Sequence, residues 1–299
     1  MKVNRNTIKR GNGEIVFQWF NILFMSAMIL ITLYPFIYVV MSSLSDSKLL
    51  LTHTGILLWP EGFTWGAYKL VFQNPNILQG YANTVFVVTV GTSINLLLTC
   101  FGAYVLSRKG VPWTNTLMLL IVFTMFFSGG MIPSYLLVNN WLHLGNSLFA
   151  LIIPAAISTW NLIILRTSFA AIPESLLESA KMDGATDFTI LARIVVPLSL
   201  PVLAVMTLFY GVNHWNAWFS SMLYLRDRDL FPLQLILREI LIQNSTEYMT
   251  SQSSAGEIET VGESIKYATI IVATLPILFI YPFLQRYFVK GVMIGSVKG

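Results

Sequence analysis

Residues 172–197 read IPESLLESAKMDGATDFTILARIVVP and interrupt a chain that is otherwise poor in charge. Pro173 suits the first turn of a helix, because the N–H that proline lacks would have no partner there. Gly184 suits the C-terminal cap of the same helix. Thr186 or Asp187 can then cap a second short helix. The stretch therefore predicts two helices joined at a glycine.

This predicted pair of helices, called the elbow and assigned to residues 172–194, is both amphipathic and acidic. Leu177 lies on its apolar side, while Glu178 and Lys181 are spaced i,i+3 for a surface ion pair. Residues 173–187 carry one Lys and four acids. An interfacial helix that binds an anionic membrane is instead rich in Lys and Arg. We therefore expect the elbow to fit a pocket of another protein rather than to serve as a lipid-bound linker.

The chain around the elbow is too apolar for a soluble protein of 299 residues. Hydrophobic residues make up 55% and charged residues 11%, whereas soluble domains carry charge on about a quarter of their residues. Asp, Glu, Lys and Arg are absent from five long blocks, at 15–45, 70–107, 110–165, 194–225 and 267–285. A membrane-crossing helix needs about 20 apolar residues, and the third block has room for two around a polar turn at Asn139, His143 and Asn146. We therefore predict an all-α integral membrane protein with six spans, at 17–41, 81–106, 115–137, 147–167, 196–224 and 268–289.

The charges that remain orient these spans. With an even number of spans, both termini lie on the same side of the membrane. That side holds 12 Lys and Arg residues and 5 acidic residues, while the other side holds 6 Lys and Arg residues and 9 acidic residues. The positive-inside rule places the first side in the cytoplasm. Because the net charge of +4 belongs to cytoplasmic span ends, membrane lipid is an expected partner and nucleic acid is not. The expected layout is a cytoplasmic segment at 1–16, a transmembrane domain at 17–289 with an external loop at 226–266, and a cytoplasmic tail at 290–299.

The elbow carries the motif by which this sequence resembles a known family. The membrane-spanning permease subunits of bacterial ABC importers share the pattern E-A-A-x(3)-G-x(9)-I-x-L-P. Its seven fixed places hold, in order, Glu178, Ser179, Ala180, Gly184, Ile194, Val196 and Pro197. Five of the seven are identical to the pattern and the spacing is preserved. The chain thus resembles these permeases over essentially its whole length.

Three further stretches narrow the resemblance to the carbohydrate-uptake branch. The ending GSVKG at 295–299 is similar to the end of the shorter permease of the maltose-type pair. The stretches FSGGMIPSY at 127–135 and WNLIILR at 160–166 are similar to permeases for complex oligosaccharides in Gram-positive bacteria. The resemblance implies import of a sugar or oligosaccharide, with the same permease role for a non-sugar cargo as the alternative.

The resemblance implies a type I ABC importer permease in a bacterial plasma membrane, with the elbow as the coupling helix that docks on an ATPase. The implied partners are a homologous second permease in a heterodimer, an ABC ATPase dimer, and an extracellular solute-binding lipoprotein that delivers the sugar. The phosphate-binding pattern G-x(4)-G-K-[ST] does not occur in the chain, so ATP and Mg are expected on the ATPase and no cofactor on this subunit. The implied ATPase contacts are Glu178, Ser179, Ala180, Asp183, Gly184, Ile194 and Pro197 in the elbow, and Lys298 and Gly299 in the tail.

The stretch YGVNHWNAW at 210–218 places polar and aromatic groups in the predicted fifth span. Amides and flat aromatic faces bind sugars, so the candidate path residues are Tyr210, Asn213, His214, Trp215, Asn216 and Trp218. An aromatic belt at the membrane interface and hydrogen bonds between helices would explain the same residues equally well. The external loop likewise has two interpretations, docking of the binding protein or plain capping of the bundle.

An intramembrane enzyme is the weakest of the functional classes. Such an enzyme would need ionisable pairs inside spans, where charge is costly and usually functional, and the charge-free blocks contain none. We therefore predict a transport subunit without catalysis of its own. Cys100 is the single cysteine, and the three histidines lie far apart in the sequence, so no metal site is expected.

Overall fold

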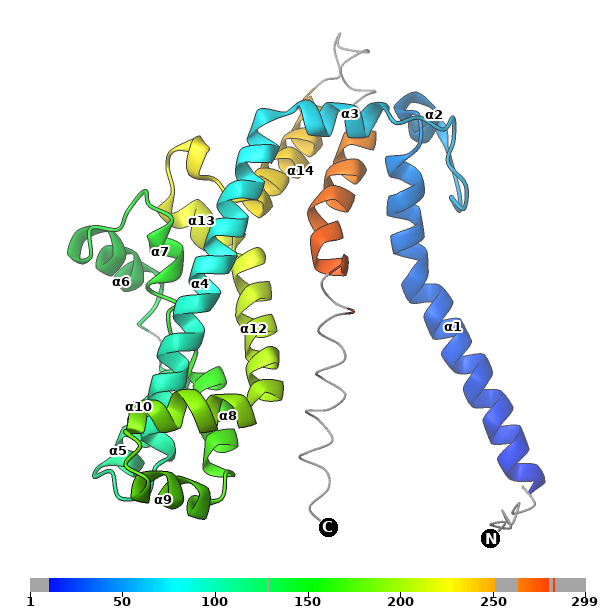
Figure 1. Ribbon diagram of the computed structural model, residues 1–299. Coiled ribbons are helices and arrows are strands. Elements are labelled where there is room, and N and C mark those ends of the chain that lie inside the picture. Colours follow the sequence, from blue (N-terminus) through cyan, green and yellow to red (C-terminus); the bar gives the residue numbers. More distant parts are fainter. Residues whose placement is uncertain (1–10, 128, 251–262, 280–281, 283–299) are drawn as a thin grey trace. The chain divides into compact units, whose positions relative to one another are not determined.

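The computed structural model describes residues 11–127, 129–250, 263–279 and 282 (Figure 1). These residues form helices joined by turns and loops, with no strand among them, which confirms the all-helical class. The chain divides into two compact units, one made of residues 1–71 and 246–271 and the other of residues 72–245 and 272–299.

The first unit is built around the long helix α1. Its helices are α1 (Asn12–Ser43), α2 (Ser47–Thr52) and most of α3 (Gly66–Gln73). Helix α1 contains the predicted first span and leaves most of its large apolar side chains exposed, as expected of a helix surrounded by lipid. The Asp46 carboxylate caps α2 by accepting from the Lys48 N–H at 2.9 Å, and Ser264 donates to the Ser45 carbonyl at 2.8 Å.

The second unit is organised along the helix α4, which contains the predicted second span. Helices α8 and α12 pack against it, and Figure 1 shows α4 and α12 side by side. The bounds are α4 (Pro75–Ser107), α8 (Thr159–Ala170) and α12 (Leu200–Trp215). Leu162, Leu165 and Leu203 meet the end of α4 in a buried apolar cluster. Residues 263–279 form a further helix, which covers part of the predicted sixth span; residues 280–281 and 283–289 of that span lie outside the described residues.

Three predicted spans are not continuous helices. The span predicted at 115–137 divides into α5 (Thr114–Phe126), α6 (Met131–Leu136) and the π-helical turn η1 (Leu137–Trp141). The span predicted at 147–167 divides into α7 (Phe149–Ile152) and α8. The span predicted at 196–224 divides into α11 (Val196–Leu198), α12 and α13 (Trp218–Tyr224). The breaks have local causes. Gly130 has a positive φ of 85° before α6, and Pro154 follows α7 and cannot donate the N–H that a helix would need. Hydropathy identifies the apolar stretches but does not indicate where the helices break.

Length and composition allow α1 and α4 each to cross a membrane. Two bent helix pairs, α5 with α6 and η1, and the segment 187–198 with α12, could each form one more span. The described residues thus contain two to four candidate spans by this criterion. The predicted number of six depends in addition on α7–α8 and on the helix at 263–279.

The first part of the predicted external loop packs on the start of α4. This part contains the turn η3 (Arg228–Leu230) and the helix α14 (Leu233–Thr250). Leu233 and Ile236 are almost fully buried. Asn83 of α4 donates to the Asp229 carbonyl at 2.7 Å, and the Leu233 N–H donates to Thr84 at 2.9 Å. Residues 251–262 of the loop lie outside the described residues.

Candidate functional site

The first arm of the elbow is the helix α9 (Glu174–Met182), which ends at Gly184 as predicted. Gly184 has a φ of 81°, a left-handed conformation that glycine adopts without steric cost. Its N–H donates to the Lys181 carbonyl at 3.0 Å, and the Ala185 N–H donates to the Ala180 carbonyl at 3.0 Å. These two bonds form a Schellman motif, so the direction in which the chain leaves α9 is fixed by the backbone.

The second arm begins with Thr186, whose side chain caps the helix α10 by accepting from the Thr189 N–H at 3.3 Å. The sequence had left Thr186 and Asp187 as alternative caps. The arm continues through α10 (Asp187–Ile190), the π-helical turn η2 (Leu191–Val195) and α11, and it meets α12 at an angle of 85°. The elbow is therefore continuous with α12 through one bend, at Ser199.

Apolar side chains anchor both arms on the ends of α4 and α8. Leu177 from α9 and Ile190 and Val195 from the second arm are buried in one cluster with Leu106 and Phe169. Burying an apolar side chain of this size contributes about 1.5–3 kcal/mol. The cluster therefore holds the elbow to the transmembrane helices as one body.

Polar contacts tie the elbow to the residues that follow α4. Lys109 pairs with Glu174 at 2.7 Å, and the Tyr104 hydroxyl donates to Asp187 at 3.0 Å. Lys181 pairs with Asp187 at 3.5 Å, so the expected Glu178–Lys181 pair is wrong. The second arm folds back over the end of α9 and brings a competing carboxylate to Lys181.

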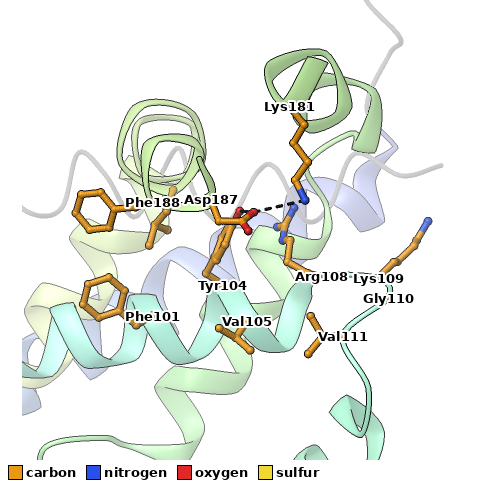
Figure 2. A pocket seen from close by; sticks show the side chains of 11 residues that line it. Phe101, Tyr104, Val105, Arg108, Lys109, Gly110, Val111, Lys181, Asp187 and Phe188 are labelled. Carbon is orange, nitrogen blue, oxygen red and sulfur yellow. Dashed lines mark hydrogen bonds and ion pairs between the residues drawn. The ribbon is translucent and has the colours of Figure 1, made fainter. Parts of the chain in front are cut away.

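Tyr104, Lys109, Lys181 and Asp187 line a pocket beside the elbow. Figure 2 shows Arg108, Lys181 and Asp187 gathered at one end and Phe101 and Phe188 at the other. The hydrogen bond and charge of Glu174 raise the pKa of Lys109, while partial burial lowers the pKa of the Arg108 guanidinium. The Arg108 guanidinium lies 4.9 Å from the centre of the Tyr104 ring. The contacts around this pocket connect the end of α4 to the elbow.

The predicted elbow residues divide into an outward group and an inward group. Glu178, Ser179, Asp183 and Gly184 are exposed on α9 and its C-terminal turn. The exposed apolar side chains beside them are Leu176, at 47%, and Met182, at 89%. On the inward side, Ala180 and Ile194 pack against the buried cluster. Pro197 belongs to neither group, because it is exposed in α11 before the bend. The structure therefore brings four of the seven residues together on one exposed face.

The candidate path residues on α12 also divide into two groups. Tyr210 and His214 are 3% exposed. The Tyr210 hydroxyl is 2.7 Å from the Thr99 hydroxyl and accepts from the Ser158 N–H at 3.0 Å, while His214 Nε2 lies 2.6 Å from Asn95 Oδ1. These two side chains therefore hold helices together.

The remaining path candidates have different surroundings. Trp215 is buried, with its ring 6.4 Å from that of Tyr81, whereas Asn213, Asn216 and Trp218 are exposed. The Trp218 ring carries the Arg238 guanidinium at 4.6 Å. Sugar contacts from this stretch are therefore available only at the exposed positions.

The sequence reasoning missed Asn95 and Thr99, which form the α4 side of this network. Asn95 Nδ2 donates to the carbonyls of Ala155 at 2.7 Å and Ala156 at 2.8 Å, in the break between α7 and α8. A signal was present in the polar and small residues that recur at helical spacing in α4, at Thr84, Gly91, Thr92, Asn95 and Thr99. Such a stripe indicates a helix face that packs closely against other helices.

The predicted tail contacts Lys298 and Gly299 lie outside the described residues. Within the described ranges, no group of three His, Cys, Asp or Glu side chains is arranged to hold a metal ion.

The family model for binding-protein-dependent transport system inner membrane components matches residues 97–294. This chain belongs to that family. The match begins in α4 and includes the elbow and α12. Members of this family are membrane-embedded transport subunits and not enzymes, so the elbow and the polar network belong to an inner membrane transport component.

Individual relatives cover nearly the whole chain. LplC of Bacillus subtilis is 41% identical over 98% of this chain and 99% of its own length. The polygalacturonan/rhamnogalacturonan transport system permease protein YtcP of Bacillus subtilis is 43% identical over 90% of this chain and 94% of its own length. Among solved structures, a chain of a bacterial ABC transporter involved in the import of the acidic polysaccharide alginate is 30% identical, with a TM-score of 0.85 over 94% of this chain and all of that chain. The inner membrane component described here therefore has the fold of an ABC importer permease.

Proposed function

We propose that this chain forms half of the membrane path of an ATP-driven importer for an oligosaccharide. The family supports transport that depends on a binding protein. The cargo class is supported by relatives named for the transport of polygalacturonan and rhamnogalacturonan and, at 26% identity, of arabinooligosaccharides. Six spans with both termini in the cytoplasm remain the topology that fits the distribution of Lys and Arg.

The exposed face of the elbow is the observation that carries the proposal. A subunit that transmits force needs a rigid projection, and the Schellman turn at Gly184 and the buried cluster under Leu177 supply the rigidity. Glu178 and Met182 supply an acid and a large apolar side chain directed away from the subunit. In this proposal the elbow docks on an ABC ATPase that binds ATP and Mg, and a shift of the elbow is passed to α12 through the bend at Ser199.

The proposed assembly contains three further kinds of protein. A homologous second permease would complete the path, a pair of ATPase subunits would bind the two elbows, and an extracellular lipoprotein would deliver the sugar. In this chain the exposed residues Asn213, Asn216 and Trp218 are the proposed sugar contacts, and Tyr210 and His214 hold the helices that present them. Lys298 and Gly299 are proposed as additional ATPase contacts.

Uptake by the reconstituted complex tests this function. The full complex is placed in proteoliposomes, and entry of a labelled oligogalacturonide or arabinooligosaccharide is measured with and without ATP and binding protein. We expect uptake only when both are present. Uptake of an amino acid or peptide under these conditions, with no uptake of either sugar, would replace the sugar cargo by another solute. Sugar uptake that persists without ATP would overturn the importer mechanism itself.

A further inference from the structure

The end of η1 and the polar turn after it form a pocket with Arg226, the second residue after α13. Its lining is Asn139, Asn140, His143, Gly145, Asn146 and Arg226. All these residues belong to the second unit. By the charge rule the pocket faces the outside of the membrane, on the side where the cargo arrives.

The backbone of this turn is held in an unusual conformation. His143 and Asn146 have positive φ values of 51° and 56°, which are uncommon for residues other than glycine and cluster at functional sites. A Cβ atom on Gly145 would collide with the Asn139 side chain. A side chain at position 145 would therefore force the Asn139 side chain to move.

Asn146 fastens the turn to the segment that carries Arg226. Its Oδ1 accepts from the N–H groups of Arg226 and Asp227, both at 3.0 Å, and its Nδ2 donates to the Asp227 carboxylate at 2.7 Å. The Asn146 N–H donates to the Tyr224 carbonyl at 2.9 Å. Below the turn, Val138 and Tyr224 are buried in one apolar cluster. The pocket is therefore preformed rather than assembled by its ligand.

Three side chains at the rim of this preformed pocket are available to bind a ligand. Asn140, His143 and Arg226 are exposed, and none of these three side chains has a hydrogen-bond or ion-pair partner among the described residues. Two other arginines of this side are engaged, because Arg228 pairs with Glu239 at 3.4 Å and Arg238 lies over the Trp218 ring. Asp227 keeps a negative charge that would oppose an anion, and the hydrogen bond from Asn146 at 2.7 Å fixes where that carboxylate lies. Arg226 is a cation of the pocket lining whose side chain is available to a ligand.

We propose that this pocket binds the carboxylate of an acidic sugar unit, with Arg226 on the carboxylate and Asn140 and His143 on neighbouring hydroxyls. The guanidinium matches a carboxylate by two parallel hydrogen bonds, and amide and imidazole groups donate to and accept from hydroxyls. Trp141, which is 80% exposed, directly follows Asn140 and provides an aromatic face of the kind that sugars stack on. This inference rests on the proposed oligosaccharide cargo and restricts it to chains that contain uronic acids.

Binding of a defined probe to the intact complex tests the proposal. The complex is placed in nanodiscs without binding protein, and saturation-transfer NMR measures the affinity for trigalacturonate and for its methyl ester, which has the same shape without the charge. We expect the acid to bind more tightly than the ester. Losing a hydrogen bond to a charged group weakens binding by roughly tenfold. The variant Arg226→Gln should therefore lose about that factor for the acid and keep its affinity for the ester.

Arg228→Gln is the matched control, since it removes an arginine two residues away that is already paired. It should leave both affinities unchanged. The pocket assignment would be overturned if wild type and Arg226→Gln bound trigalacturonate equally well, or if wild type did not bind it at all. ATP-driven uptake of oligosaccharide is measured separately, so either result would leave the proposed transport function standing. If Arg226→Gln instead weakens binding of the sugar-free binding protein and leaves trigalacturonate binding intact, the pocket receives that protein and the proposal is wrong.

Discussion

The elbow and the α4–α12 interface both place polar residues in a very apolar chain, and the structure uses the two sets in opposite ways. In the elbow, Glu178 and Asp183 are exposed, while the apolar residues beneath them hold the segment in place. In the interface, Asn95 and His214 are buried and bound to each other. Polar groups with no partner in the subunit indicate a surface for another molecule. Polar groups that satisfy each other, or a broken backbone, indicate internal structure.

The same distinction applies to the broken helix within the predicted span at 147–167. The break between α7 and α8 exposes the carbonyls of Ala155 and Ala156 and the N–H of Ser158. Asn95 donates to both carbonyls, and Tyr210 accepts from the N–H. Irregular backbone is tolerated inside a membrane only where such partners exist. The interface residues therefore make this part of the fold possible.

The largest effect is expected from Gly184→Pro, which would change the direction in which the backbone leaves α9. Proline holds φ near −65°, whereas Gly184 has a φ of 81° and uses its N–H in the turn. We expect uptake to fall to background while ATP hydrolysis by the complex continues. The matched control is Gly55→Pro, at another exposed glycine with a φ of 127°, which should retain most uptake. Equal loss in both variants would remove the special role of the elbow.

The interface should respond with stability rather than coupling. In Asn95→Leu the buried carbonyls of Ala155 and Ala156 lose their donors, at about 1–3 kcal/mol for each unsatisfied group. A loss of about 2–3 kcal/mol should lower the unfolding midpoint by roughly 5 °C or more, as measured by thermal unfolding in detergent. The exposed Asn213, changed to Leu, is the control and should leave the midpoint unchanged. A midpoint unaffected by Asn95→Leu would contradict the structural role of the network.

A smaller effect is expected at the exposed apolar tip of the elbow. Met182 is 89% exposed and should become buried when an ATPase docks, where a central apolar contact contributes about 1–2 kcal/mol. Met182→Ser should therefore weaken association of the isolated ATPase with the permease pair by roughly tenfold, without changing thermal stability. Met131→Ser, at a methionine that is 56% exposed in α6, should leave this association unchanged. If both variants bind the ATPase like wild type, the tip is not part of the contact.

The smallest effect is expected at the exposed ion pair between Lys109 and Glu174. Surface pairs contribute little because solvent screens them. Glu174 raises the pKa of Lys109, so the lysine is charged at neutral pH. Any stabilisation of the fold by this ion pair is therefore present at neutral pH and is lost only as the pH rises through the raised pKa of Lys109. Lys109→Gln should therefore match wild type in thermal unfolding at both neutral and mildly alkaline pH. A clear loss of stability would assign this pair a larger part in anchoring the elbow.

The elbow could be predicted closely because its signals are local. The signals of Pro173, Gly184 and Thr186 each act within a few residues. Gly184 follows α9 as predicted, Pro173 is the N-cap just before the first turn where it was expected, and Thr186 is one of the two caps that the sequence allowed. The partner of Lys181 could not be predicted, because it depends on how the second arm folds back toward α9.

The interface could not be derived from the sequence because its contacts join distant residues. Asn95 meets carbonyls 60 and 61 positions away and a histidine 119 positions away. A polar residue in an apolar helix looks the same whether it lines a path or bonds a neighbour. For this reason Tyr210 and His214 entered the candidate path, and only the arrangement of α4, α8 and α12 gives them their partners.

The number of sugar molecules transported per ATP hydrolysed, measured for Glu178→Lys in the reconstituted complex, tests the central claim most directly. Glu178 is exposed on α9, and among the described residues its side chain makes no hydrogen bond or ion pair, although its charge helps to raise the pKa of Lys109. The control Glu14→Lys reverses an exposed acid in the first turn of α1. The elbow mechanism predicts that this ratio falls at least severalfold for Glu178→Lys and stays at the wild-type value for Glu14→Lys. A wild-type ratio in the Glu178→Lys complex would contradict the claim that this face of the elbow couples ATP hydrolysis to transport.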